Sequence, residues 1–205
     1  MRAMRKHPSA KGPGPKSAVA SWVRGLGPLA ILLAFAVLSL PVLASQTKAP
    51  ANPVVVFETA KGTFEIELFQ ADAPKSVEQI LALVKRGFYR GQRIHRVTPT
   101  LAQWGDPKSK DMTFQEYWGT GGSGRAINAF EVSKKHNHVR GAVGLAHSGN
   151  PMAADSQIYV MKAASASLDG KHAVIGQVTT GMAVVDKLQV TDVIKNVSLK
   201  GAGPK

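Results

Sequence analysis

The run RIHRVTPTLAQWGD, residues 93–106, holds the residue types that best fit a reaction site. Its first six residues mix β-branched and polar positions, which is typical of a strand. Pro99 ends that strand because proline has no N–H donor. Since side chains alternate along a strand, Arg96 is expected to share a face with Ile94 and Thr98.

The second polar candidate is Gln103, in a segment from Leu101 to Asp106 that is predicted to turn. An arginine held on a strand beside small apolar residues and a glutamine predicts a shallow apolar groove with two polar groups pointing into it. The alternative for an isolated R-x-x-P pattern is a solvated surface arginine. The residues farther along the chain favour the groove.

Two other patterns suggest ligand chemistry, and both are disfavoured. His136 and His138, with Glu131 nearby, could hold a metal, but they are expected in a loop without a third ligand in register. The segment GTGGSG, residues 119–124, matches G-x-G-x-x-G, yet no apolar strand precedes it and no helix pattern follows. We interpret it as a flexible surface loop, so no nucleotide and no metal site is predicted.

Nucleophilic chemistry is also disfavoured. The chain has no cysteine, which excludes disulfides, thiolate metal sites and cysteine nucleophiles. Ser148, His172 and Asp155 could be combined into a triad, but no nucleophile-elbow sequence surrounds Ser148.

The length of the chain indicates one globular domain with appendages. The 205 residues carry a formal charge of +13. Six of the basic residues precede residue 25 and no acidic residue does, so the remainder carries a net +7. Those charges are scattered, without a basic helix or interleaved aromatics, and a nucleic-acid site is therefore not expected.

We interpret the first 44 residues as a targeting segment. Residues 1–24 are basic and interpreted as disordered, and LAILLAFAVLSL in residues 26–44 is strongly apolar. Val42, Leu43 and Ala44 end it with residues suited to signal peptidase. A cleaved signal peptide, an uncleaved inner-membrane anchor and a buried helix remain open. In the first two cases the rest is exported, either periplasmic or anchored to the inner membrane.

The remaining chain predicts a linker over 45–53, a domain over 54–200 and a tail over 201–205. The domain opens with a hairpin of strands 54–59 and 63–69, followed by a helix over 74–86 with Pro74 in its first turn and Gly87 at its end. Residues 108–125 are loop-like. Further strands are expected at 142–146, 156–161, 173–178 and 195–199, and a second helix, capped by Thr180, over 180–188. Many short strands and few helices favour an antiparallel barrel with helices over its ends.

Four runs in order resemble the cyclophilins: APKSVEQILALVKRGFYRG, IHRVTP with QWGD, RGAVGLAHSGNPMAADSQIYV, and LDGKHAVIGQVTTGMAVVDKL. The resemblance spans residues 54–199. It implies a mainly β fold, a closed eight-stranded antiparallel β-barrel capped by two α-helices.

The resemblance also implies roles for ten residues and no cofactor. The catalytic set would be Arg96, Gln103 and His172. The substrate-binding set would be Leu101, Ala146, His147, Ser148, Gln157, Tyr159 and Leu168.

Some positions depart from the family pattern. Tyr159 stands where a phenylalanine is usual, Leu101 replaces a pocket phenylalanine, and Ala102 takes the place of a larger apolar residue. Ser167 occupies the place of a tryptophan that resembles the determinant of cyclosporin binding. A wider proline pocket and weak sensitivity to that drug are expected.

The implied activity is peptidyl-prolyl cis-trans isomerisation of proline-containing segments in exported proteins, by a monomer. The alternative is a cyclophilin-like module that binds such segments without turnover. A hollow barrel for a small apolar ligand is disfavoured, because large residues at alternating positions would fill the interior.

Overall fold

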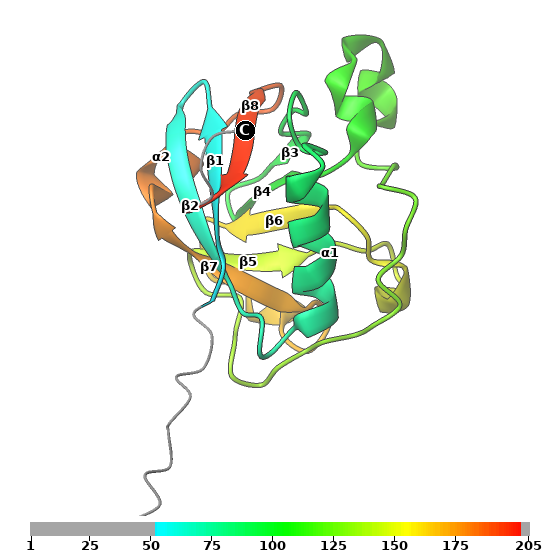
Figure 1. The fold of residues 1–205 in the computed structure, drawn as a ribbon, viewed down its shortest axis with the longest axis vertical. Helices are drawn as coiled ribbons and strands as arrows, with labels where there is room; N and C mark the ends of the chain where they lie inside the picture. The colour runs from blue at the N-terminus through cyan, green and yellow to red at the C-terminus, as the bar shows by residue number, and fades with distance from the viewer. Residues whose placement is uncertain (1–51, 202–205) are drawn as a thin grey trace, which may run out of the picture. The chain divides into compact units, whose positions relative to one another are not determined.

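The computed structural model describes residues 52–201 and contains one curled antiparallel sheet (Figure 1). Its strand order is β3-β4-β6-β5-β7-β2-β1-β8. The strands are β1 (Val54–Thr59), β2 (Gly62–Leu68), β3 (Arg96–Val97), β4 (Leu101–Trp104), β5 (Ala142–Leu145), β6 (Ile158–Met161), β7 (Val174–Thr180) and β8 (Ile194–Leu199). The predicted leader, nearly all of the linker and residues 202–205 lie outside the described residues.

The predicted eight-stranded antiparallel sheet is confirmed, but the strand order is open. It ends at β3 and β8, which are not paired along their lengths. The two ends meet where Arg93 and Val193 form an isolated bridge, with hydrogen bonds from Ile94 N–H to Asp192 O (2.9 Å) and from Ile194 N–H to Gln92 O (2.8 Å). The sheet is therefore described as a half-barrel.

Helix α1 (Pro74–Lys85) forms as predicted, with Pro74 in its first turn and Gly87 at a φ of 68° after its end. Its buried face contributes Val77, Ile80 and Val84 to the core. Glu131 accepts the backbone N–H groups of the first turn, from Lys75 at 3.0 Å and Ser76 at 2.8 Å. A carboxylate in this position satisfies two donors that the helix itself leaves unpaired.

The second helix is shorter than predicted. Helix α2 covers only Met182–Asp186 and follows Gly181 at a φ of 82°, so the predicted cap by Thr180 is wrong. Thr180 stays in β7, paired with Glu65 of β2. Neither helix among residues 52–201 has the length and apolar character needed to cross a bilayer.

The region from Arg93 to Asp106 differs most from its prediction. Residues 101–104, expected to turn, form β4, and the turn lies at Thr98–Thr100, where Thr98 Oγ1 accepts the N–H of Leu101 at 3.1 Å. All four β4 residues are buried. Because both faces are covered, the segment lacks the alternation that marks a half-exposed strand. Ile94 is buried and Arg96 exposed, so they do not share a face.

Alternating residues of β4, β5 and β6 divide into two apolar clusters on opposite faces of the sheet. The inner cluster holds Ala102, Trp104, Ile158 and Val160 together with the apolar face of α1. The outer cluster contains Leu101, Tyr159, Met161, Ala142 and Val174. The outer face of the sheet therefore carries an apolar cluster that is separate from the inner core.

The segment predicted as a loop over 108–125 contains two short 3-10 helices, η1 (Pro107–Lys110) and η2 (Met112–Tyr117). They project beside the sheet at the upper right of Figure 1. Other 3-10 turns are η3 (Pro151–Ala153) and η4 (Ala166–Leu168).

Candidate active site

A single row across four strands carries the central residues of the candidate site. Arg96 of β3 pairs with Gln103 of β4, Gln103 pairs with Tyr159 of β6, and Tyr159 pairs with Gly144 of β5. Directly opposed residues in an antiparallel sheet point to the same face. The register therefore places the arginine, the glutamine and the tyrosine side by side on the outer face.

A cavity of about 140 Å³ lies over this row. All eight residues that line it were predicted as site residues from the sequence: Arg96, Leu101, Gln103, Ala146, His147, Tyr159, Leu168 and His172. The two remaining predicted residues, Ser148 and Gln157, line an adjoining cavity of about 510 Å³. Gln103, Ala146 and His147 line both.

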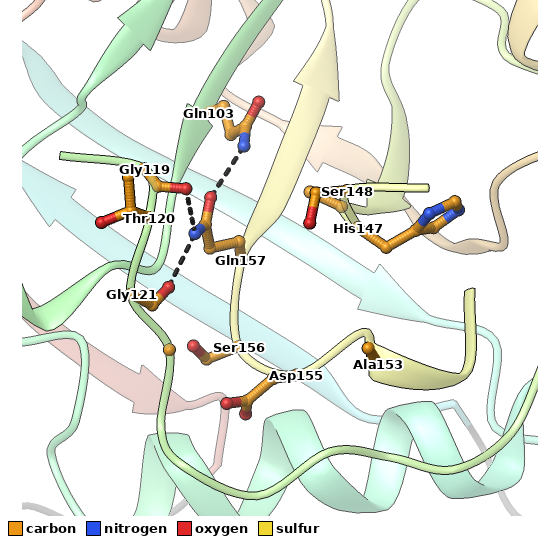
Figure 2. A pocket seen from close by; sticks show the side chains of 12 residues that line it. Gln103, Gly119, Thr120, Gly121, His147, Ser148, Ala153, Asp155, Ser156 and Gln157 are labelled. Atoms are coloured by element: carbon orange, nitrogen blue, oxygen red, sulfur yellow. Dashed lines mark hydrogen bonds between the residues drawn. The ribbon is translucent and has the colours of Figure 1, made fainter. Parts of the chain in front are cut away.

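A chain of side-chain hydrogen bonds runs from the second cavity to Arg96. Figure 2 shows the part that joins Gly119 and Gly121 to Gln157 and Gln103. Gln157 Nε2 donates to the carbonyl oxygens of Gly119 (2.8 Å) and Gly121 (2.7 Å). Gln103 Nε2 donates to Gln157 Oε1 at 2.9 Å, and Arg96 Nη1 donates to Gln103 Oε1 at 3.2 Å. This order of donors orients both amides, and Arg96 also lines the smaller cavity.

The glycine-rich segment 119–124 is held in place by two aspartates. Buried Asp106 accepts the N–H groups of Gly119 (2.7 Å) and Gly121 (2.9 Å) through Oδ2. Asp155 accepts from Gly124 N–H at 3.0 Å and from the hydroxyl of Ser123. A side chain at Gly121 would meet Asp106 Oδ1 at 2.4 Å. The predicted surface loop is confirmed, and glycine at position 121 allows its backbone to lie close to a carboxylate.

The edge segment Ala146–Ser148 connects β5 to η3. Ala146 N–H donates to Gln157 O at 2.9 Å, which ties the segment to the residues before β6. Within residues 52–201 no hydrogen bond reaches the carbonyl oxygens of Ala146 or His147. Both oxygens are available to an extended peptide laid along this edge.

Two stacked imidazoles form one wall of the smaller cavity. The rings of His147 and His172 lie 4.1 Å apart between centroids at an angle of 23°. Burial lowers the pKa of His172, and the neighbouring His147 lowers it further. His147 Nε2 lies 3.0 Å from Lys171 O, and His172 Nδ1 lies 3.3 Å from Leu145 O. Since a carbonyl oxygen only accepts, each of these ring nitrogens carries the proton.

The floor of the cavity is the Tyr159 ring, which meets His172 edge to face at 6.0 Å and 82°. Its hydroxyl points away from Arg96, toward His138 Nε2 at 2.9 Å. Burial raises the pKa of this hydroxyl, and the nearby Asp169 carboxylate raises it further. The phenol is therefore neutral and keeps its proton for donation.

Two expected departures from the family pattern do not shape the cavity. Ala102 points into the inner cluster and does not widen the pocket, because it lies on the opposite face of β4 from Leu101 and Gln103. Ser167 is exposed on η4 and lies within 3.0 Å of Ser165, outside the residues lining the cavity.

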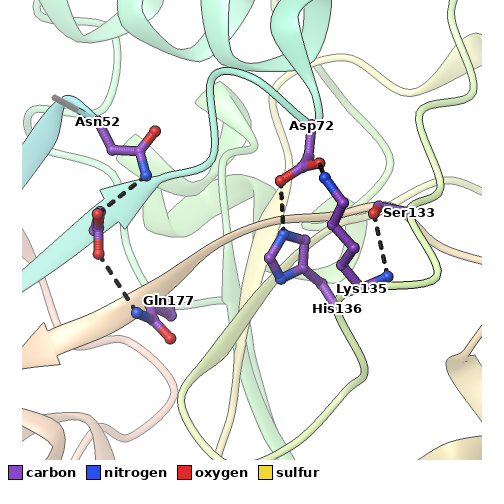
Figure 3. A network of polar contacts seen from close by, with 7 residues as sticks. Asn52, Asp72, Ser133, Lys135, His136 and Gln177 are labelled. Atoms are coloured by element: carbon purple, nitrogen blue, oxygen red, sulfur yellow. Dashed lines mark hydrogen bonds and ion pairs between the residues drawn. The ribbon is translucent and has the colours of Figure 1, made fainter. Parts of the chain in front are cut away.

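The two histidines considered as metal ligands have separate partners. His136 Nε2 lies 3.0 Å from Asp72 Oδ2, and Lys135 pairs with the same carboxylate (Figure 3). The His136 ring also stacks on Phe69. His138 bonds Asp169 and Tyr159 instead. Sequence reasoning missed the structural roles of Asp106, Asp155 and Asp169, because these hydrogen bonds join residues 13 to 32 positions apart and leave no local pattern.

Comparisons with known proteins identify the family of this chain. The profile of the family described as cyclophilin type peptidyl-prolyl cis-trans isomerase/CLD matches residues 54–202. The chain belongs to that family. A probable peptidyl-prolyl cis-trans isomerase from Brucella suis is 39% identical over 175 residues, covering 82% of this chain and 89% of the relative. A peptidyl-prolyl cis-trans isomerase from Helicobacter pylori is 36% identical over 143 residues, covering 68% and 82%.

Solved structures show the same fold at lower identity. A cyclophilin type peptidyl-prolyl cis-trans isomerase from Cryptosporidium parvum aligns with a TM-score of 0.65 and 22% identity, covering 73% of this chain and 98% of that one. A second structure of that protein was determined in the presence of the dipeptide Ala-Pro. A cyclophilin from Hirschia baltica aligns with a TM-score of 0.59, covering 71% and 73%.

Proposed function

We propose that this chain is a peptidyl-prolyl cis-trans isomerase that acts on extended segments of exported proteins, with Arg96 stabilising the twisted prolyl amide. The observation that carries the proposal is the position of the Arg96 guanidinium at the rim of an apolar cavity of about 140 Å³. That cavity has an apolar floor and one polar row along its side, which suits a proline ring whose amide bond lies against the row.

The chemistry requires no nucleophile. An X-Pro bond rotates over a barrier of about 18–20 kcal/mol because its C–N bond has partial double-bond character. Twisting ends that resonance and localises a lone pair on the prolyl nitrogen. A guanidinium aimed at this nitrogen donates a hydrogen bond that exists only in the twisted state, which is differential transition-state binding.

The neighbouring groups orient Arg96 and bind the substrate. Gln103 orients Arg96 through the 3.2 Å hydrogen bond. Tyr159, Leu101 and Leu168 grip the ring. The carbonyl oxygens of Ala146 and His147 accept backbone N–H groups of the client. Together they lower the barrier by about 5–7 kcal/mol, equivalent to a roughly 10⁴- to 10⁵-fold acceleration.

The test measures cis-to-trans conversion in a chromogenic tetrapeptide with one Ala-Pro bond. Arg96→Ala should lose about 100- to 1,000-fold in kcat/KM, comparable to removing one preorganised donor elsewhere, and Arg96→Lys should recover only a part. Arg90→Ala, an exposed arginine away from the cavity, is the control. Wild-type protein that converts the peptide at the uncatalysed rate while still binding it would favour the non-catalytic binding module.

We further propose that the domain acts outside the cytoplasm as a monomer, delivered by the apolar segment 26–44. Cell fractionation, with N-terminal sequencing of the exported material, distinguishes cleavage after Ala44 from retention as an anchor. Recovery in the cytoplasm would contradict export.

We propose as well that the half-barrel closes in solution along residues 91–94 and 191–194, with both helices covering its open ends. The isolated bridge and the hydrogen bonds of Ile94 and Ile194 support closure. The Ile94 and Ile194 amides should then exchange with solvent as slowly as those of β1. Fast exchange at both would count against closure.

A further inference from the structure

We propose that Asp169 and His138 are positioning residues that hold the Tyr159 ring as the floor of the proline cavity, so that a hydrogen-bond chain sets the width of that cavity. The inference rests on the proposed function. It assigns a positioning role to two residues that do not line the cavity themselves.

The chain consists of three groups in line. Asp169 Oδ1 accepts the backbone N–H of His138 at 2.7 Å and lies 2.8 Å from its Nδ1. His138 Nε2 lies 2.9 Å from the Tyr159 hydroxyl. The His138 side chain is 1% exposed and that of Asp169 is 30% exposed. The chain therefore runs from a partly solvated carboxylate, through a buried imidazole, to the floor of the cavity.

The carboxylate determines the tautomer of the imidazole. Asp169 accepts only, and hydrogen bonds from His138 lower its pKa, the backbone N–H first and the imidazole second. His138 therefore carries its proton on Nδ1 and presents the Nε2 lone pair to the tyrosine. The Tyr159 O–H donates to that lone pair, which defines the direction of the ring.

The chain also joins three separate segments around the cavity. His138 precedes β5, Tyr159 lies on β6, and Asp169 directly follows Leu168. His138 O accepts the N–H of Ser165 at 2.8 Å, and His172 N–H donates to Leu168 O at 3.1 Å. Release of Asp169 would loosen the short segment 165–172, which carries two residues of the cavity wall.

The expected kinetic effect follows from what Tyr159 touches. Its ring contacts a bound proline equally in the cis, trans and twisted states, so loss of ring position weakens ground-state and transition-state binding alike. Such uniform binding appears in KM rather than kcat. Loss of Arg96, in contrast, lowers kcat.

The experiment measures kcat and KM of the full-length protein with the Ala-Pro tetrapeptide. Tyr159→Phe and Asp169→Ala should each raise KM about 5- to 10-fold while kcat changes less than 2-fold. Asp169→Asn, which keeps an Oδ1 acceptor, should stay within 2-fold of wild type in KM. Asp72→Ala is the matched control, because it removes the carboxylate of the other histidine pair, at His136.

Coupling and tautomer provide two independent readouts. The double variant Tyr159→Phe with Asp169→Ala should raise KM no more than the larger single effect, since both changes break one chain. Nitrogen-15 NMR of the imidazole should show His138 protonated on Nδ1 and bare on Nε2, with an Nε2 shift change in Tyr159→Phe.

Unchanged KM in both single variants, additive effects in the double variant, or a proton on Nε2 would each overturn the inference. These outcomes are separable from failure of the proposed function. An inactive wild type removes the isomerase claim, and the inference is then tested by the Kd of the same peptide in place of KM, together with the NMR signature.

Discussion

Gly144 and Tyr159 face each other across the β5–β6 ladder, and a Cβ atom on Gly144 would lie 2.2 Å from Cζ of the tyrosine. The tyrosine ring leans over the glycine to reach His138. The absence of a side chain at Gly144 is therefore what allows the aromatic ring and hydroxyl of Tyr159 to lie across β5 and form the floor of the cavity.

Gly144→Ala should consequently destabilise the fold and displace the ring. Overpacking of a well-packed site costs about 1–3 kcal/mol, measurable as a lower urea midpoint with an unchanged slope. The loss should shrink to a few tenths of a kcal/mol when the same change is made together with Tyr159→Val. An equal loss in both backgrounds would mean that another neighbour opposes the added methyl group.

Gln157→Leu tests the hydrogen-bond chain that ends on Arg96. The change keeps the side-chain volume but removes the acceptor for Gln103 and the donor to Gly119 and Gly121. Gln103 then loses its orientation, and we expect kcat/KM to fall about 10-fold, or 1.4 kcal/mol. Gln177→Leu, at an exposed position on β7, should leave the rate unchanged.

Asp106→Asn tests whether the glycine-rich segment is held by charge-assisted hydrogen bonds. Both carboxylate oxygens accept, from Lys108 N–H at 2.9 Å and from Gly119 and Gly121. An amide offers one acceptor and places its NH₂ against N–H donors, so about 1–3 kcal/mol of stability should be lost.

The same variant should show faster amide exchange at Gly119 and Gly121. Asp111→Asn is the matched control, because Asp111 is an exposed carboxylate that accepts from Thr113. If the glycine amides remain protected in Asp106→Asn, the segment is held by contacts other than this carboxylate.

The depressed pKa of His172 gives a pH dependence with a definite sign. Burial and His147 lower the pKa in the folded state, so below pH about 6.5 the unfolded chain binds a proton that the folded chain does not. The stability that neutral His172 contributes to the folded state is fully present above pH about 6.5 and is lost as the pH falls below that value. His95, whose pKa burial also lowers, acts in the same direction.

His172→Gln should therefore flatten the fall in stability below pH about 6.5 relative to wild type, leaving the part due to His95. Peptide affinity of the wild type should also weaken over this range, because protonation of His172 places a poorly solvated charge in the wall of the apolar cavity. Parallel stability profiles for the two proteins would show that His172 does not contribute.

The sequence correctly predicted those helices and strands that bury one face in the core and expose the other to solvent. The β1–β2 hairpin alternates apolar and polar residues, and α1 repeats apolar residues at helical spacing between Pro74 and Gly87. Local periodicity reports such elements directly. Strand β4 was missed because LAQW is buried on both faces, and α2 was overextended because the β-pairing of Thr180 with Glu65 outweighed its capping propensity.

The sequence identified the residues of the candidate site, but it did not predict the hydrogen bonds that connect them. The family motifs named the eight residues that meet over β3, β4 and β6, though their roles remain predictions. No sequence pattern predicted that Asp106 binds the N–H groups of Gly119 and Gly121, or that Asp169 binds the histidine that contacts Tyr159. The sequence around a polar residue does not show which distant residue it will bind.

By itself, the sequence determined that the domain is a mainly β fold with Arg96 and Gln103 in one short run and no cysteine chemistry. Tertiary structure alone decided which face each side chain occupies and which distant group completes its hydrogen bonds. The physical reason is that strand periodicity and turn chemistry are local. Register and the satisfaction of buried polar groups depend instead on strands that meet only when the sheet curls.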